Sequence, residues 1–137
     1  MSARSKARKR ALDVLFEADA KGVPVPTVLA ETVRRRAADG EPALNAYTLE
    51  LVEGIVANQS AVDAALTSSL TDWSLERLPA VDREVLRLGA YEILFSEDVP
   101  DAVAIDEAVE LARSLSTEES PAFVNGVLGA VQRSQRV

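Results

Sequence analysis

The sequence predicts an all-α fold, and three observations support that class. Apolar residues recur at spacings of three and four along most of the 137 residues, as they do in helices with one buried face. No segment alternates apolar and polar residues for long, and the residue clusters typical of strands are missing. Proline and glycine interrupt the pattern at distances that suit ordinary helices. We therefore expect a compact bundle of about six to seven helices.

The first half of the chain holds three expected helices and an extension. The first helix spans residues 2–21 and ends at Gly22. Its predicted buried arc consists of Ala11, Leu12, Val14, Leu15, Phe16 and Ala18. The second helix follows Pro26, stops at Asp39, and carries on one side Val28, Leu29 and Val33. Pro42 opens the third helix, and an extension follows with Val62, Leu66 and Leu70.

The polar segment TDWSLERLP, residues 71–79, interrupts the helical pattern and is the predicted internal boundary. It divides the chain into an N-terminal helical subdomain, residues 1–72, and a C-terminal one, residues 73–137. After the boundary, residues 80–95 carry so wide an apolar face that we expect a central helix, buried between its neighbours.

Two further helices complete the predicted second subdomain. One covers residues 102–115, and the other begins at Ser120, an expected N-cap, with Pro121 in its first turn. Gly126 and Gly129 are poor helix formers, and we interpret them as the site of a close helix crossing.

Composition argues against an enzyme and against a membrane protein. The chain has neither Cys nor His, so it lacks the commonest general base and the commonest transition-metal ligands. Its acidic residues have no calcium-loop spacing, and we expect no cofactor and no metal. No apolar run approaches the roughly 20 residues of a membrane span. We expect a cytoplasmic protein.

A run of basic residues near the N-terminus contrasts with the acidic rest of the chain. It contains five of the fifteen cations, namely Arg4, Lys6, Arg8, Lys9 and Arg10. Taking their charges from the total of −7 leaves −12 for the remaining residues. Cations in the first turns of a helix oppose its macrodipole, so folding gives no reason for them. The run indicates an arm that follows a phosphate backbone, and the alternative is a solvated tail that aids solubility.

A second basic run, Arg34 to Arg36, differs in its position. Cations near a helix C-terminus complement the macrodipole, so we interpret these three arginines as helix-stabilising residues on a solvated face.

Recognition of unpaired RNA usually adds flat side chains to such charge. The candidates are Phe16, Tyr47, Trp73, Tyr91, Phe95 and Phe123. Tyr47 and Phe95 are assigned to the core by default, whereas Phe123 lies in the first turn of the last helix. Asn125 has two interpretations that the sequence does not separate: a buried hydrogen bond to backbone, or direct contact with RNA.

Three stretches of the chain resemble one known family. ARKRALDVLFEAD, LPAVDREVLRLGAYEILF and DVPDAVAIDEAVELARSLSTEESPAFVNGVLGAV resemble the NusB family of bacterial transcription antitermination factors, in the same order and over nearly the whole chain. Residues 22–39 carry little of the likeness. The resemblance implies two packed helical subdomains and a non-enzymatic protein. It also implies a function: binding, together with the ribosomal protein NusE, to boxA single-stranded RNA of ribosomal RNA leaders, so that RNA polymerase resists termination.

The resemblance also implies roles for particular residues. It makes the basic arm the RNA-binding segment and adds RNA contacts at Glu119 and Phe123. It places the NusE surface at Glu76, Arg77, Asp82 and Arg87. Phe16 stands where relatives have Tyr, so a hydroxyl contact is lost there. A homodimer is left open, because some relatives dimerise.

Two alternatives to this function are a protein-interaction module without RNA contact and an accessory subunit of an RNA methyltransferase.

Overall fold

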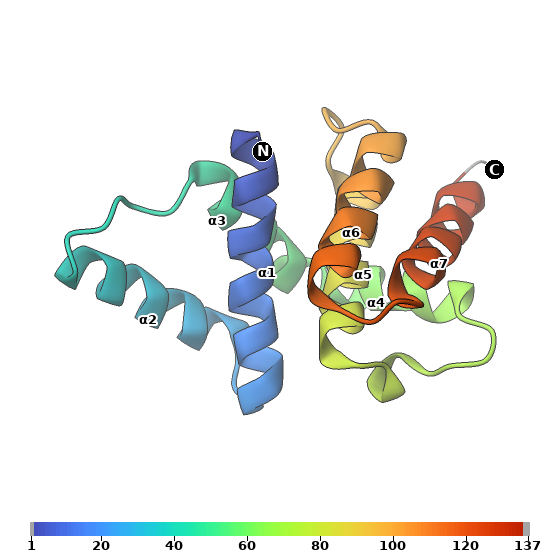
Figure 1. The fold of residues 1–137 in the computed structure, drawn as a ribbon, viewed down its shortest axis with the longest axis horizontal. Helices are drawn as coiled ribbons and strands as arrows, with labels where there is room; N and C mark the ends of the chain where they lie inside the picture. The colour runs from blue at the N-terminus through green and yellow to red at the C-terminus, as the bar shows by residue number, and fades with distance from the viewer. Residues whose placement is uncertain (1, 136–137) are drawn as a thin grey trace. The chain divides into compact units, whose positions relative to one another are not determined.

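The computed structural model describes residues 2–135, and within them the fold is all-helical. Seven α-helices and one short 3₁₀ helix follow one another without a strand in this part of the chain (Figure 1). Their bounds are α1 Ala3–Lys21, α2 Val25–Ala38, α3 Ala46–Ala57, α4 Gln59–Ser69, η1 Leu75–Arg77, α5 Ala80–Phe95, α6 Asp101–Leu115 and α7 Ser120–Ser134. The predicted fold class is therefore confirmed.

The chain divides into two compact units, and the first ends at Ala57. In this unit 1, α1 packs against both α2 and α3. The Ser2 hydroxyl caps α1 by accepting a hydrogen bond from the Ser5 N–H at 3.0 Å. Gly22 ends it in the left-handed region with φ 66°, where glycine is favoured. The predicted bounds of the first helix are thus close to the observed ones.

The core of unit 1 forms where α1 and α3 meet. Leu15 and Leu51 are among its fully buried side chains. The Thr48 hydroxyl of α3 donates a hydrogen bond to the Ala7 carbonyl of α1 at 3.0 Å. This buried bond holds the start of α1, which carries the basic run, against α3.

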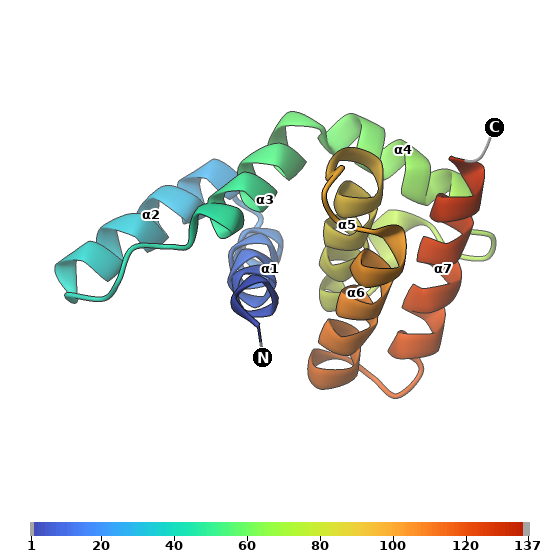
Figure 2. The ribbon, with the colours of Figure 1, turned by 90° about the horizontal axis from the view of Figure 1, so that it is seen from above.

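Unit 2 begins at Asn58, and α5 is its central helix. α5 packs against α4, α6 and α7, and Figure 2 shows α5, α6 and α7 side by side. The prediction that residues 80–95 form a helix buried between neighbours is confirmed. Because α4 packs on α5 and α7, it belongs to unit 2, so the units divide before α4, whereas the sequence placed the boundary after it.

The glycine at a close helix crossing is Gly89, on α5. A Cβ at Gly89 would lie 2.5 Å from Leu128 Cδ1, so α5 and α7 approach too closely for a larger residue. The prediction for Gly126 and Gly129 was wrong. A Cβ at Gly126 would meet nothing within 4 Å, and one at Gly129 would meet only the α7 side chain of Arg133.

Two aromatic side chains and the start of one helix differ from the predictions. Phe16 is 39% exposed, because α1 turns the face of Ala11 and Leu15 to the core and leaves Phe16 outside. Phe95, assigned to the core, is exposed while its ring stacks on Tyr91. The third helix begins at Ala46 and not at Pro42.

Candidate nucleic-acid interface

The five cations of the basic run lie in the first turns of α1, on different sides of the helix. Arg4, Lys6 and Arg10 are exposed, and Lys9 is half-buried. Arg8 is only 2% exposed, so it does not belong to the outer surface of the arm. From here on, the exposed arm means Arg4, Lys6, Lys9 and Arg10.

Two of the arginines are held by an aromatic ring of α3. The guanidinium carbon of Arg4 lies 4.3 Å from the centre of the Tyr47 ring, and that of Arg8 lies 5.6 Å from it. One turn of α1 separates the two arginines, so both reach the same ring. Cation–π contacts of this kind stabilise by about 0.5–1 kcal/mol at exposed sites and by about 2 kcal/mol when desolvated. The start of α1 is therefore an ordered helix attached to α3.

The outer face of α1 combines charge with an exposed ring. Lys9 pairs with Asp13 one turn later. Phe16 lies two turns after Lys9 and so projects from the same side of the helix. This face presents a cation followed by an aromatic ring, a combination found in proteins that bind single-stranded nucleic acid.

A polar pocket of about 220 Å³ lies next to the arm in unit 1. Its lining includes Arg10, Arg35 and Arg36, together with three carboxylates, those of Asp13, Glu17 and Glu41. Arg36 donates two hydrogen bonds to the Pro42 carbonyl, at 2.9 and 2.7 Å, and pairs with Glu41 at 3.0 Å. Arg34 and Arg35 are exposed as expected, but Arg36 fixes the loop after α2.

A second pocket, in unit 2, contains two of the residues predicted to contact RNA. Its volume is about 220 Å³, and its lining consists of Trp73, Leu78, Pro79, Asp82, Thr117, Glu119, Ser120 and Phe123. We call it the Trp73 pocket. The family resemblance implied RNA contacts at Glu119 and Phe123, and both residues line this one pocket. Trp73 appeared in the sequence only as one of six aromatic candidates.

Asn125 does not lie in the Trp73 pocket. It is exposed, so a buried hydrogen bond to backbone does not account for it. Two residues along a helix turn by about 200°, so Asn125 projects from the side of α7 opposite Phe123.

Asp82 is a buried carboxylate that holds the start of α7. It is 5% exposed, and it accepts hydrogen bonds from the Ser116 hydroxyl at 2.6 Å and the Ser120 hydroxyl at 3.0 Å. The Ser120 side chain is thus bonded to α5. Ser120 is the first residue of α7, and Glu119 occupies the N-cap position that was predicted for Ser120. This network sets the position of the turn that carries Glu119 and Phe123.

The four residues predicted to meet NusE separate into two pairs. Glu76 and Arg77 are exposed on η1. Asp82 is buried, as described above, and Arg87 is half-buried in an ion-pair network. Arg87 bonds both carboxylate oxygens of Asp63, at 2.9 and 3.1 Å, and reaches Glu84 at 2.7 Å. The exposed part of the predicted partner surface is thus η1 itself.

Arg87, predicted on the NusE surface, and Arg83, which the sequence did not single out, both have clear structural roles. Burial alone would lower the pKa of Arg87, but its hydrogen bond to Asp63 and the charges of Glu84 and Asp63 raise that pKa above its usual value. Arg83 donates to the carbonyl oxygens of Leu75, Glu76 and Leu78, at 3.2, 3.1 and 3.0 Å. Arg83 therefore fixes η1 on α5.

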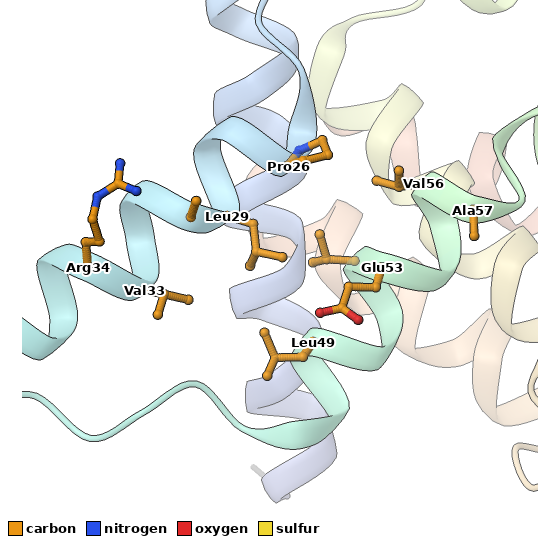
Figure 3. A pocket seen from close by; sticks show the side chains of 10 residues that line it. Pro26, Leu29, Val33, Arg34, Leu49, Glu53, Val56 and Ala57 are labelled. Carbon is orange, nitrogen blue, oxygen red and sulfur yellow. The ribbon is translucent and has the colours of Figure 1, made fainter.

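An apolar groove of about 610 Å³ lies between α2 and α3 in unit 1. Leu29 and Leu49 project into it from opposite sides (Figure 3). Val33 also lines it and is 46% exposed, whereas Val28, predicted on the same side of the helix, is 1% exposed. None of the predicted site residues lines this groove.

Residues 2–135 contain neither a metal-ligating cluster nor a membrane-spanning helix. No group of three or more His, Cys, Asp or Glu side chains in this range could hold a metal ion. Among the described helices, none is both long enough and apolar enough to cross a membrane.

The fold and the exposed arm together define a class: a small all-helical protein with a surface suited to a polyanion. Comparison with known proteins gives the family. The NusB family matches residues 5–133, and the chain belongs to that family. A transcription antitermination protein NusB from a Nocardioides species is 53% identical over 135 residues, which cover 98% of this chain and 97% of that protein.

Solved structures agree with this assignment. NusB from T. maritima superimposes with a TM-score of 0.81 at 34% identity, covering 96% of this chain and 92% of that one. A chain in a crystal structure of the antitermination factors NusB and NusE in complex with dsRNA gives a TM-score of 0.81 at 28% identity, covering 96% of each chain.

Proposed function

We propose that this chain is a transcription antitermination factor that binds boxA RNA of ribosomal RNA leaders together with NusE. The observation that carries the proposal is the exposed arm: four cations on an ordered helix of a chain whose net charge is −7. Family membership supports the same role, since relatives at about half identity bear the name transcription antitermination protein. The similar chain solved with NusE and dsRNA supports the two partners.

The mechanism is positioning and not catalysis. Arg4, Lys6, Lys9 and Arg10 attract the phosphates and set the path of the RNA, but phosphate contacts carry no sequence information. Unpaired bases are read by aromatic and polar side chains, for which Phe16, Glu119 and Phe123 are the candidates. Arg8 acts indirectly, because its contact with Tyr47 holds the helix that bears the arm.

The NusE surface is proposed at Glu76 and Arg77 of η1, which are exposed and fixed by Arg83. Asp82 and Arg87 act there as positioning residues. The acidic charge outside the arm suits a basic ribosomal protein. Bound to both partners, the chain would act within the RNA polymerase antitermination complex in the cytoplasm.

The test is a titration of single-stranded boxA RNA at several salt concentrations, with and without NusE. Four phosphate contacts at about −0.7 each predict a slope of log affinity against log salt near −2.8. Affinity should then fall about 50-fold between 50 and 200 mM salt. Replacing all four residues of the exposed arm by Gln should flatten the slope.

A matched control removes four exposed cations elsewhere by the same substitution, at Lys21, Arg34, Arg113 and Arg133. It changes the net charge equally and should keep most of the slope. If the arm variant binds RNA with unchanged affinity and slope, the proposed function is wrong.

A second candidate function is protein binding without RNA contact, which the apolar groove between α2 and α3 favours. Leu29, Val33, Leu49 and Val56 give it an apolar lining, and a partner helix can lay its apolar face in such a groove. NusE binding with no measurable RNA binding by the intact protein would support this candidate over the first.

A further inference from the structure

The Trp73 pocket has the size of a site for one small planar group. Its volume of about 220 Å³ lies below the about 300–1,000 Å³ of pockets for drug-sized molecules. The lining comes from the segment before η1, from the residues just before α5 and its first turn, and from the loop before α7 and the first turn of α7.

Trp73 is exposed in a segment that buries both of its leucines. Leu75 and Leu78, its neighbours along the chain, are each 6% exposed, whereas Trp73 is 56% exposed. A single exposed apolar side chain is ordinary on a protein surface. Trp73, however, lines a pocket that a second aromatic ring, that of Phe123, also lines. An exposed indole next to such a pocket is a platform on which a flat ligand can stack.

We propose that the Trp73 pocket takes one unpaired nucleobase of the bound RNA, with Trp73 as a stacking residue beside Phe123. This inference rests on the proposed function, because it requires that the chain bind single-stranded RNA. Stacking on aromatic rings is the common means by which proteins hold splayed-out bases.

The polar groups of the pocket indicate which base edge fits. Both carboxylate oxygens of Asp82 already accept hydrogen bonds, from Ser116 and Ser120. Glu119 is exposed at the same pocket, and its carboxylate can only accept. A carboxylate accepts from the exocyclic amino group of adenine, cytosine or guanine and from the ring N–H of guanine or uracil, so the edge that fits is one that carries a donor.

The first test needs no substitution, because Trp73 is the single tryptophan of the chain. Titration of the intact protein with single-stranded boxA RNA should quench the tryptophan fluorescence, with the same midpoint as RNA binding measured by another signal. RNA binding without any change in tryptophan emission would overturn the proposal.

The second test compares Trp73→Ala with Trp73→Phe. Loss of one stacked base should weaken RNA binding by about 5- to 150-fold in the alanine variant, which corresponds to about 1–3 kcal/mol. The phenylalanine variant keeps a ring and should retain most of the affinity. The control Phe95→Ala removes an exposed aromatic of the same unit outside the pocket, and its RNA affinity should change less than twofold.

RNAs with one base at a time replaced by an abasic sugar locate the contact. At the position that occupies the pocket, the abasic RNA should bind the intact protein weakly, and Trp73→Ala should add no further loss. Independent losses at every position would contradict a base in this pocket.

The outcomes separate this inference from the proposed function. If the arm variant loses RNA binding while Trp73→Ala binds normally, the function stands and the pocket assignment is wrong. If Trp73→Ala loses NusE affinity and keeps RNA affinity, the pocket takes a protein side chain and the assignment is again wrong. If the intact protein binds no RNA, both fail.

Discussion

The exposed arm of unit 1 and the Trp73 pocket of unit 2 use different physical chemistry. The arm is charge on the surface of one helix, and its attraction for phosphates weakens as salt rises. The pocket acts through the shape of its walls, which three separate stretches of chain form around two aromatic rings. Attraction and selection are therefore divided: the arm suits any RNA, whereas the pocket can distinguish an unpaired base from a paired one.

The largest loss of stability is expected at Asp82, because the Trp73 pocket depends on the buried hydrogen bonds of this carboxylate. Asp82→Ala leaves the Ser116 and Ser120 hydroxyls without their carboxylate acceptor. The free energy of unfolding should fall by about 2–3 kcal/mol, measured by urea denaturation. Asp106→Ala, at an exposed position of α6, is the control and should change stability by less than about 0.5 kcal/mol.

Asp82→Ala should also weaken RNA binding without changing its salt slope, because no phosphate contact is removed. An altered slope would show that the pocket and the arm are not separate. Asp82→Lys would bury an unpaired charge and destabilise unit 2, so that variant does not test the NusE surface. Glu76→Lys on exposed η1 is the suitable test of that surface.

A smaller effect is expected at Tyr47, which attaches the arm to α3. Tyr47→Leu keeps an apolar side chain but removes the ring beneath Arg4 and Arg8. Stability should fall by about 1–2 kcal/mol. Amide hydrogen exchange in the first turns of α1 should become faster, while that of α7 stays as in the intact protein. Unchanged exchange in α1 would mean that Tyr47 does not hold the arm.

The smallest effect is expected at Asn125, on the side of α7 away from Phe123. Asn125→Ala should change the free energy of unfolding by less than about 0.5 kcal/mol. RNA affinity, measured beside Phe123→Ala, should stay within twofold of the intact protein, whereas Phe123→Ala should lose about 5-fold or more. Equal losses of RNA affinity in the two variants would show that Asn125 contacts the RNA, which is one of the two interpretations of this residue.

The sequence predicted the fold class and most helix bounds, because these follow from periodicity and from local signals such as Gly22 and Pro79. It predicted the arm from charge alone. It did not show that Arg8 is buried, because the ring that Arg8 contacts, Tyr47, lies on another helix. The family resemblance placed Asp82 on a partner surface, and its burial was not evident because the two serines that bond it lie 34 and 38 residues later.

Glycine shows the same limit of local information. Gly126 and Gly129 have the residue type of a helix crossing, but only the packing of α5 on α7 makes Gly89 the residue that a crossing requires. Likewise, Trp73 becomes a site residue only when η1, α5 and α7 bring Phe123 and Glu119 to it.

The most direct test of the division between attraction and selection is one plot of log RNA affinity against log salt for three proteins. The intact chain should give a slope near −2.8, and the variant with four Gln in the arm a slope near zero. Trp73→Ala should give a line parallel to that of the intact chain, displaced to weaker binding by the same factor at every salt concentration. A Trp73→Ala line that flattens, or an arm variant that keeps the full slope, would contradict the account.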